Sequence, residues 1–167
     1  RGAIYGDVLA NLLKFNGNKV IKEYYINDYG NQIRIFVESI HFRIMEIKYK
    51  KEFPKNKNLY PGLYIKDIAK KIIKENIDLD LRDFEKNFDF LKKVSIKTSM
   101  DLIKKDLKLL GISHDNFSSE TDLVKKDLVN KAVYKLKEKK FVEEGYLQPP
   151  KGENNNNWKK IKRLIFK

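Results

Sequence analysis

The stretch Glu23-Tyr24-Tyr25-Ile26-Asn27-Asp28-Tyr29-Gly30-Asn31-Gln32 decides the fold. Its first half is rich in aromatic and β-branched residues, which predicts a strand. Its second half is polar, contains a glycine and precedes an amphipathic segment. A strand that ends in such a loop before a helix places polar side chains at the carboxyl edge of a sheet, where open α/β folds bind ligands.

Four residues of this loop are candidate substrate-binding residues: Asn27, Asp28, Gly30 and Gln32. The amides of Asn27 and Gln32 can hydrogen-bond a polar ligand. Asp28 can pair with a cation, and Gly30 can adopt a positive φ. The alternative is that Asn27 or Asp28 only caps the following helix, since both residue types are common at helix N-termini. Spacing alone favours the cap.

Hydrophobic periodicity predicts a mostly helical chain with a few strands, and glycine and proline mark several of the boundaries. The last two strands are expected to form an antiparallel hairpin with a polar tip. We expect helices at residues 3–15, 33–47, 64–75, 80–94, 100–110 (capped by Thr98-Ser99) and 121–139, and strands at 19–26, 112–117, 141–147 and 163–166.

Composition excludes several kinds of site. The 167 residues include no cysteine, which excludes disulfides, thiolate zinc sites and a cysteine nucleophile. The two histidines cannot form a histidine-rich metal site or a triad; we expect His41 to pack and His114 to be a solvated loop side chain. Apolar runs are short, which argues against a membrane span. We therefore expect a cytoplasmic protein with no metal site.

The chain carries 36 Lys and Arg against 23 Asp and Glu, a formal net charge of +13. Such a charge suits nucleic acid, because basic residues neutralise phosphates. Only five of the 36 are Arg, the residue that suits bidentate phosphate recognition. We therefore attribute the charge mainly to a Lys-, Ile- and Asn-rich composition. Trp158, which lies among lysines, could stack a base, although an aromatic residue at a hairpin edge more often covers the sheet.

The blocks Arg1–Asp7 and Glu23–Ile33 strongly resemble arginyl-tRNA synthetase of the bacterial type, a class I aminoacyl-tRNA synthetase. In that family a His-x-Gly-His signature precedes an Arg-Gly-Ala helix, and a Tyr-Tyr-Ile-Asn-Asp-x-Gly-x-Gln strand and loop follow. The similarity covers nearly the whole chain. The other segments similar to the family are Tyr60–Ile65, Asp67–Ala69, Asp106–Leu107, Leu110–Ile112 and His114–Glu120.

The resemblance implies an arginine–tRNA ligase, which activates L-arginine with ATP, accompanied by Mg²⁺, and transfers it to tRNA(Arg) in protein synthesis. It also implies a monomer.

The implied fold is α/β, a partial Rossmann-like catalytic domain that is mostly helical by content, with an inserted antiparallel β-hairpin near the C-terminus. The Asn27 to Gln32 loop then lies beside the arginine and ATP pocket, which reverses the preference for a cap. Three parts are implied: the first part of the catalytic core (1–48), a helical stretch ending in a candidate core strand (49–120), and a long helix with a truncated hairpin (121–167).

The chain also departs from the family pattern. It lacks the signature histidines and the Lys-Met-Ser-Lys-type loop, so its catalytic residues are unknown. It starts without methionine and stops inside an apolar stretch, so we expect an internal segment of the catalytic region that is inactive alone. Two alternatives stay open: a non-enzymatic basic module that binds tRNA or other RNA, and the product of a decayed or split gene.

Overall fold

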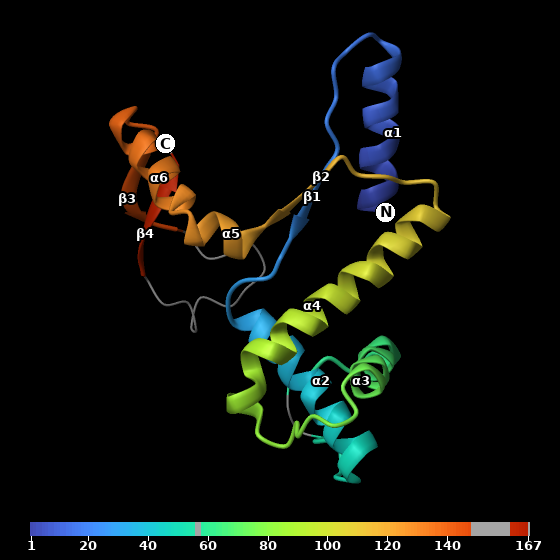
Figure 1. Ribbon diagram of the computed structural model, residues 1–167. Coiled ribbons are helices and arrows are strands. Elements are labelled where there is room, and N and C mark those ends of the chain that lie inside the picture. Colours follow the sequence, from blue (N-terminus) through green and yellow to red (C-terminus); the bar gives the residue numbers. More distant parts are fainter. Residues whose placement is uncertain (56–57, 148–160, 167) are drawn as a thin grey trace. The chain divides into compact units, whose positions relative to one another are not determined.

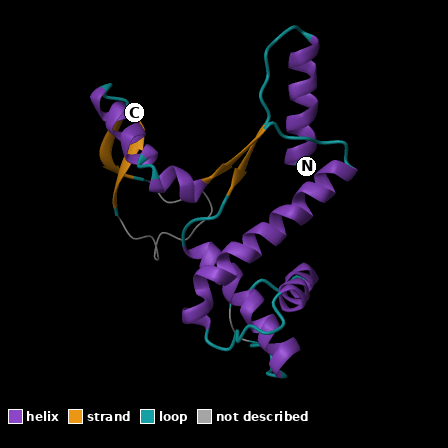
Figure 2. Ribbon diagram, viewed as in Figure 1, coloured by secondary structure: helices purple, strands orange, loops and turns teal. Residues whose placement is uncertain are grey.

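The structure, a computed structural model, describes residues 1–55, 58–147 and 161–166 (Figure 1). Helices predominate among these residues (Figure 2), which confirms the predicted mostly helical content. No helix in these ranges combines the length and apolarity needed to cross a membrane. The chain divides into two compact units, Arg1–Glu120 and Thr121–Lys167. The first unit contains α1 (Gly2–Phe15), β1 (Glu23–Ile26), α2 (Asn31–Tyr49), α3 (Leu63–Glu75), α4 (Phe84–Leu109) and β2 (Asn116–Ser119).

Three helices build the core of the first unit. Helices α2, α3 and α4 contact one another in every pairing, and the apolar residues of each recur at helical spacing. Burying one such side chain contributes about 1.5–3 kcal/mol relative to leaving it in water. The buried core residues are Val37, Ile40, Ile44, Ile65, Ile68, Ala69, Ile72, Leu81 and Leu91.

Helix α1 has the extent that periodicity predicts, and Gly17, at φ 79°, follows its C-terminal cap residue. Its apolar face is not covered by the described chain. Ile4, Val8 and Leu12 are each about half exposed, and Ala10 is the buried residue of the helix. Spacing therefore predicted the helix correctly but says nothing about what covers it.

Helix α4 corrects the prediction of two helices at 80–94 and 100–110. The helix runs without interruption from Phe84 to Leu109, and its N-terminal cap is Asp83, whose side chain accepts a hydrogen bond from the Lys86 backbone N–H at 3.0 Å. Thr98 lies inside the helix and is buried. No glycine or proline stands between residues 84 and 109, so nothing in the sequence stops the helix.

The two strands of the first unit pair in parallel, Glu23–Ile26 with Asn116–Ser119. Both are four residues long, whereas the sequence predicted strands at 19–26 and 112–117. A strand exists only where a partner backbone lies beside it, and the partner begins at Asn116. Before Asn116, the Lys22 backbone N–H bonds a side chain instead of a strand backbone: it donates to the Asp115 carboxylate at 2.7 Å.

The second unit corrects the prediction of one long helix at 121–139. Helix α5 (Glu120–Lys125), which begins at the last residue of the first unit, and helix α6 (Leu128–Glu138) are separated at Asp127, whose φ is 57°. Aspartate tolerates this left-handed conformation better than most residues. Its carboxylate also accepts a hydrogen bond from Asn130 at 2.7 Å. Local side-chain chemistry, invisible to hydrophobic spacing, therefore breaks the helix.

An antiparallel pair completes the second unit, as predicted. Strand β3 (Val142–Tyr146) pairs with β4 (Lys162–Phe166), and Lys162 forms an ion pair with Glu144 at 2.7 Å. The predicted polar tip and Trp158 lie outside the described residues.

Replacing Ile68 by alanine should lower the free energy of unfolding by about 2–5 kcal/mol, because the change empties part of the core. Ile77 is 68% exposed, so Ile77→Ala is a matched control and should change stability by less than about 0.5 kcal/mol. Urea unfolding followed by far-UV circular dichroism measures both variants. Equal effects would contradict the assignment of the core.

Candidate functional site

The loop between β1 and α2 is shaped by Gly30. This residue has φ 84° and ψ −174° and is the N-cap residue of α2. Only glycine adopts such a conformation without strain, which agrees with the positive φ expected from the sequence. The chain therefore turns from β1 into α2 within the four residues 27–30.

The capping alternative for this loop is wrong. The N-cap position of α2 is occupied by Gly30, which has no side chain to cap the helix, and not by Asn27 or Asp28. Asp28 is instead buried, and its carboxylate accepts a hydrogen bond from the Ser119 hydroxyl at 2.6 Å. Asp28 thus ties the loop to the end of β2.

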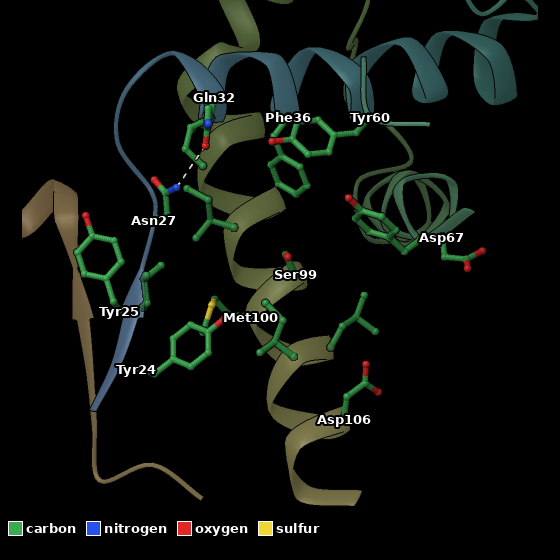
Figure 3. Close-up of a pocket in the computed structure, with 16 residues that line it drawn as sticks. Tyr24, Tyr25, Asn27, Gln32, Phe36, Tyr60, Asp67, Ser99, Met100 and Asp106 are labelled. Atoms are coloured by element: carbon green, nitrogen blue, oxygen red, sulfur yellow. Dashed lines mark hydrogen bonds between the residues drawn. The ribbon is translucent and has the colours of Figure 1, made fainter. Parts of the chain in front are cut away.

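Asn27 and Gln32 lie together at the edge of a cavity. The Asn27 Nδ2 atom donates a hydrogen bond to Gln32 Oε1 at 3.4 Å (Figure 3). Both residues line the cavity, whereas Asp28 and Gly30 are not among its lining residues. Of the four predicted residues, two therefore face the space that could hold a ligand, and two shape the loop that carries them.

The cavity has a volume of about 570 Å³ and lies between β1 and the helices α2, α3 and α4. Tyrosine, phenylalanine and aliphatic side chains form most of its wall. Asp67 and Asp106 are its acidic residues, and none of its lining residues is Lys, Arg or His. The lining residues are Tyr24, Tyr25, Ile26, Asn27, Gln32, Ile33, Phe36, Tyr60, Tyr64, Asp67, Ile96, Ser99, Met100, Leu102, Ile103 and Asp106.

The aromatic side of the cavity is held by contacts with α2. The Tyr60 ring meets the Phe36 ring edge to face, with centroids 5.8 Å apart, and the Tyr60 backbone N–H donates to the Ser39 hydroxyl at 2.9 Å. Burial raises the pKa of Tyr64 above its usual value of 10.0, and nearby Tyr60 adds to the shift. Tyr64 is therefore a neutral hydroxyl at physiological pH.

Sequence reasoning did not assign Tyr64, Ser99 or Asp106 to the site. A signal for the last two existed, because Ser99, Ile103 and Asp106 recur at helical spacing on one face of α4. The helix break expected at Thr98-Ser99 hid this periodicity. The lining residues Tyr60 and Asp106 lie in the motifs similar to the synthetase family, but no role was attached to them.

The two histidines lie outside this cavity. His41 packs as predicted: its Nε2 atom is 2.9 Å from the Leu81 carbonyl oxygen, and burial lowers its pKa. His114 lies in a loop, as predicted, but its side chain is only partly exposed and not fully solvated. Its ring contacts the Tyr24 ring edge to face at 5.4 Å, and its Nδ1 atom is buried with no hydrogen-bond partner among the described residues. The contact between His114 and Tyr24 exists only because β2 pairs with β1. Local sequence does not show that pairing.

An ion pair links α1 to the segment that leads into β1. The Lys22 ammonium lies 2.8 Å from an Asp7 carboxylate oxygen, and Asn11 donates to the other oxygen at 3.1 Å. The hydrogen bond from Lys22 lowers the pKa of Asp7 below its usual 3.8. The start of β1 is therefore anchored at Asp7 as well as at β2.

No protein-family model matches the chain. Over its whole length, however, the chain is 51% identical to the arginine–tRNA ligase of Pelagibacter ubique, 44% identical to that of Ehrlichia chaffeensis and 40% identical to that of Wolbachia pipientis wMel. Over its whole length, the chain is therefore similar to one segment of arginine–tRNA ligases. It spans 29% of the length of each of these relatives.

A solved structure shows the same similarity. The chain superimposes with a TM-score of 0.72 on a crystal structure from Campylobacter jejuni assigned as an arginyl-tRNA synthetase, at 31% sequence identity. The match covers 87% of this chain and 32% of that one. The resemblance read from Arg1–Asp7 and Glu23–Ile33 is thereby confirmed.

Gly30→Ala should destabilise the first unit by about 1–2 kcal/mol, because alanine resists a positive φ. Gly6 lies inside α1, where an added methyl group would meet open space, so Gly6→Ala should instead stabilise by about 0.5–1 kcal/mol. Chemical denaturation of the two variants measures both values. A Gly30→Ala variant that is as stable as the parent chain would refute the assigned conformation of Gly30.

Asp7→Asn should reduce stability at pH 7 and lose this effect in acid. Because the native pKa of Asp7 is lowered, the charged form contributes stability above the unfolded-state pKa of about 3.8. That contribution disappears as pH falls through the lower native value. Unfolding free energies of both proteins at pH 7, 5 and 3 test this, and a deficit that stays constant with pH would contradict it.

Proposed function

We propose that the chain is part of an arginine–tRNA ligase and contributes to its catalytic region. The reaction joins the L-arginine carboxylate to the α-phosphate of ATP and releases pyrophosphate. The arginyl group then passes to a hydroxyl of the terminal ribose of tRNA(Arg), and AMP leaves. The observation that carries the proposal is the similarity to arginine–tRNA ligases over the whole chain, together with Asn27 and Gln32 at a cavity.

The proposed architecture is a Rossmann-like class I catalytic domain. Support comes from the parallel pairing of Glu23–Ile26 with Asn116–Ser119 and from the polar loop at the carboxyl end of β1, the ligand-binding edge of such sheets. In this proposal residues 1–48 begin the catalytic core, residues 49–120 form its helical stretch and second strand, and residues 121–167 carry the inserted hairpin.

The four loop residues divide the work of substrate binding. Asn27 and Gln32 contact the substrates through their amides, because both reach the cavity. Asp28 and Gly30 fix the loop, one through Ser119 and the other through its positive φ. Such groups act by positioning, since aligned reactants need no covalent enzyme nucleophile.

ATP is the proposed nucleotide substrate, accompanied by Mg²⁺. Among the described residues no three His, Cys, Asp or Glu side chains gather as metal ligands, so these residues do not fit a protein-made magnesium cage. Mg²⁺ that arrives on ATP phosphates keeps much of its water shell. We further propose a monomer in the cytoplasm, where translation takes place.

A non-enzymatic RNA-binding module is the weaker candidate. The net charge of +13 supports this candidate. That charge follows from the Lys-rich composition of the whole chain and does not indicate a binding surface. The relatives that match the whole chain are ligases, which favours an enzyme.

A chimera tests the proposed function. The matching segment of the Pelagibacter ubique ligase is replaced by this chain, and attachment of radiolabelled arginine to tRNA(Arg) is measured. We expect the chimera to charge tRNA, and Asn27→Ala or Gln32→Ala to lower kcat/KM about tenfold or more, since a lost hydrogen bond to a charged ligand costs about 1.5–3 kcal/mol. Asn18→Ala, in the exposed segment after α1, is the matched control.

The chain alone should show no arginine-dependent exchange of pyrophosphate with ATP. A chimera without charging activity, despite cooperative unfolding like that of the parent ligase, would sink the proposal. Robust exchange by the isolated chain would overturn the claim that it works only as part of a larger enzyme.

A further inference from the structure

Helix α4 carries a row of lysines on one side. Their positions advance by seven and four residues in turn, and both steps return to nearly the same side of a helix with 3.6 residues per turn. Lys86 and Lys104 are separated by five complete turns. Each residue of the row is exposed. We call this row the lysine face of α4, and its members are Lys86, Lys93, Lys97, Lys104 and Lys108.

The alignment of these lysines is not a consequence of composition. A lysine-rich sequence determines how many lysines a helix contains, whereas their alignment depends on the positions they occupy. The net charge of +13 does not show where the cations lie. The lysine face is therefore a local concentration of positive charge that the structure identifies and the total charge does not.

Acidic residues stand beside the lysine face without neutralising it. Asp89 and Asp101 border it on opposite sides. Asp101 is paired with Lys71 of α3 at 3.8 Å, and Glu85 is paired with Arg34 of α2. Within the described ranges no ion pair involves a lysine of this face. Its ammonium groups are therefore available to an anionic partner.

The lysine face is long enough to follow an extended polyanion. From Lys86 to Lys108 the helix rises about 33 Å, at 1.5 Å per residue, and α4 is continuous over this length (Figure 1). A lysine ammonium is a compact, strongly hydrated charge that contacts a phosphate as a point charge. A nucleic-acid backbone carries its negative charges in a row. Such a backbone therefore matches both the length and the chemistry of the face.

The described residues at this face present no free aromatic ring on which an unpaired base could stack. Proteins that hold single strands combine cations with such rings. Phe90 of α4 packs against the core. The Phe117 ring of β2 is covered by the Lys104 ammonium, which lies 4.3 Å from the ring centroid. A double helix, whose bases are turned inward, needs only contacts to its backbone and shape.

We propose that the lysine face of α4 binds the phosphate backbone of a double-helical RNA stem without reading its sequence. The narrow major groove of an RNA helix brings two rows of phosphates close together, so one row of ammonium groups reaches both. The major groove of DNA is about 12 Å wide, so the same row reaches one side. The choice of RNA rests on the proposed function, in which a tRNA is a substrate. The surface itself is separate from the cavity, because no residue of the lysine face lines it.

Fluorescence anisotropy with the complete 167-residue chain tests this proposal. The labelled probes are an RNA hairpin whose stem is longer than the face, an RNA hairpin of shuffled stem sequence, a DNA hairpin of the first sequence and an unpaired RNA strand. We expect both RNA hairpins to bind equally and to lose affinity as salt rises from about 50 to 200 mM, because phosphate contacts release counterions. The DNA hairpin and the unpaired strand should bind about threefold or more weakly. Affinity that depends on stem sequence, or DNA that binds as tightly as RNA, would overturn the proposal.

Paired variants connect this binding to the lysine face. Lys93→Gln combined with Lys97→Gln should weaken both RNA hairpins about tenfold and reduce the salt slope by about 2, since each lost phosphate contact lowers it by about one. The matched control is Lys92→Gln combined with Lys105→Gln. It removes the same charge from the same helix, but each of these lysines lies about 100° around the helix from its neighbour on the face.

The control pair should bind within about twofold of the parent chain, and circular dichroism confirms that both pairs are folded. An equal loss of affinity in the two pairs would show that total charge, and not the lysine face, holds the RNA. Unchanged binding by the folded Lys93 and Lys97 pair would likewise refute the face.

The two proposals can fail separately. An active chimera combined with RNA binding that does not depend on Lys93 and Lys97 defeats the lysine face alone. RNA binding that does depend on these two residues, combined with an inactive chimera, defeats the ligase proposal alone.

Discussion

The candidate site depends on one contact, the parallel pairing of Glu23–Ile26 with Asn116–Ser119. Parallel strands bring their carboxyl ends to the same edge, so Ile26 lies opposite Ser119. This register lets Ser119 hold Asp28 and lets Asp115 hold the Lys22 backbone. The strand pairing holds the two ends of residues 27–115 together. Helix α4, which lies in this segment, lines the same cavity as β1.

The helices show what spacing alone can predict. Apolar residues at helical intervals identified α1, α2 and α3 to within two residues at each end, because their apolar residues recur regularly on one face. The same method divided α4 at Thr98 and joined α5 to α6 across Asp127. Thr98 has the chemistry of a cap but is buried within a helix, and Asp127 adopts a left-handed conformation. Both outcomes depend on neighbours that a local pattern does not contain.

The site shows the same division between local and distant information. The positive φ of Gly30 and the nearness of Asn27 to Gln32 follow from a loop of a few residues, so the sequence could suggest them. The hydrogen bond from Ser119 to Asp28 joins residues 91 positions apart. The aromatic contacts of His114 likewise require β2 to lie beside β1. Resemblance to a family identified these blocks without assigning the contacts.

The pairing of β1 with β2 also has a consequence for biosynthesis. The first strand leaves the ribosome long before its partner, because residues 27–115 must be made in between. At about 5–20 residues per second the wait is roughly 5–20 s. During that time the backbone of Tyr24, Tyr25 and Ile26 has no partner strand, while helices α2 and α3 can already pack against each other. Such high sequence separation slows folding, so the candidate site is the part of the first unit that a nascent chain completes last.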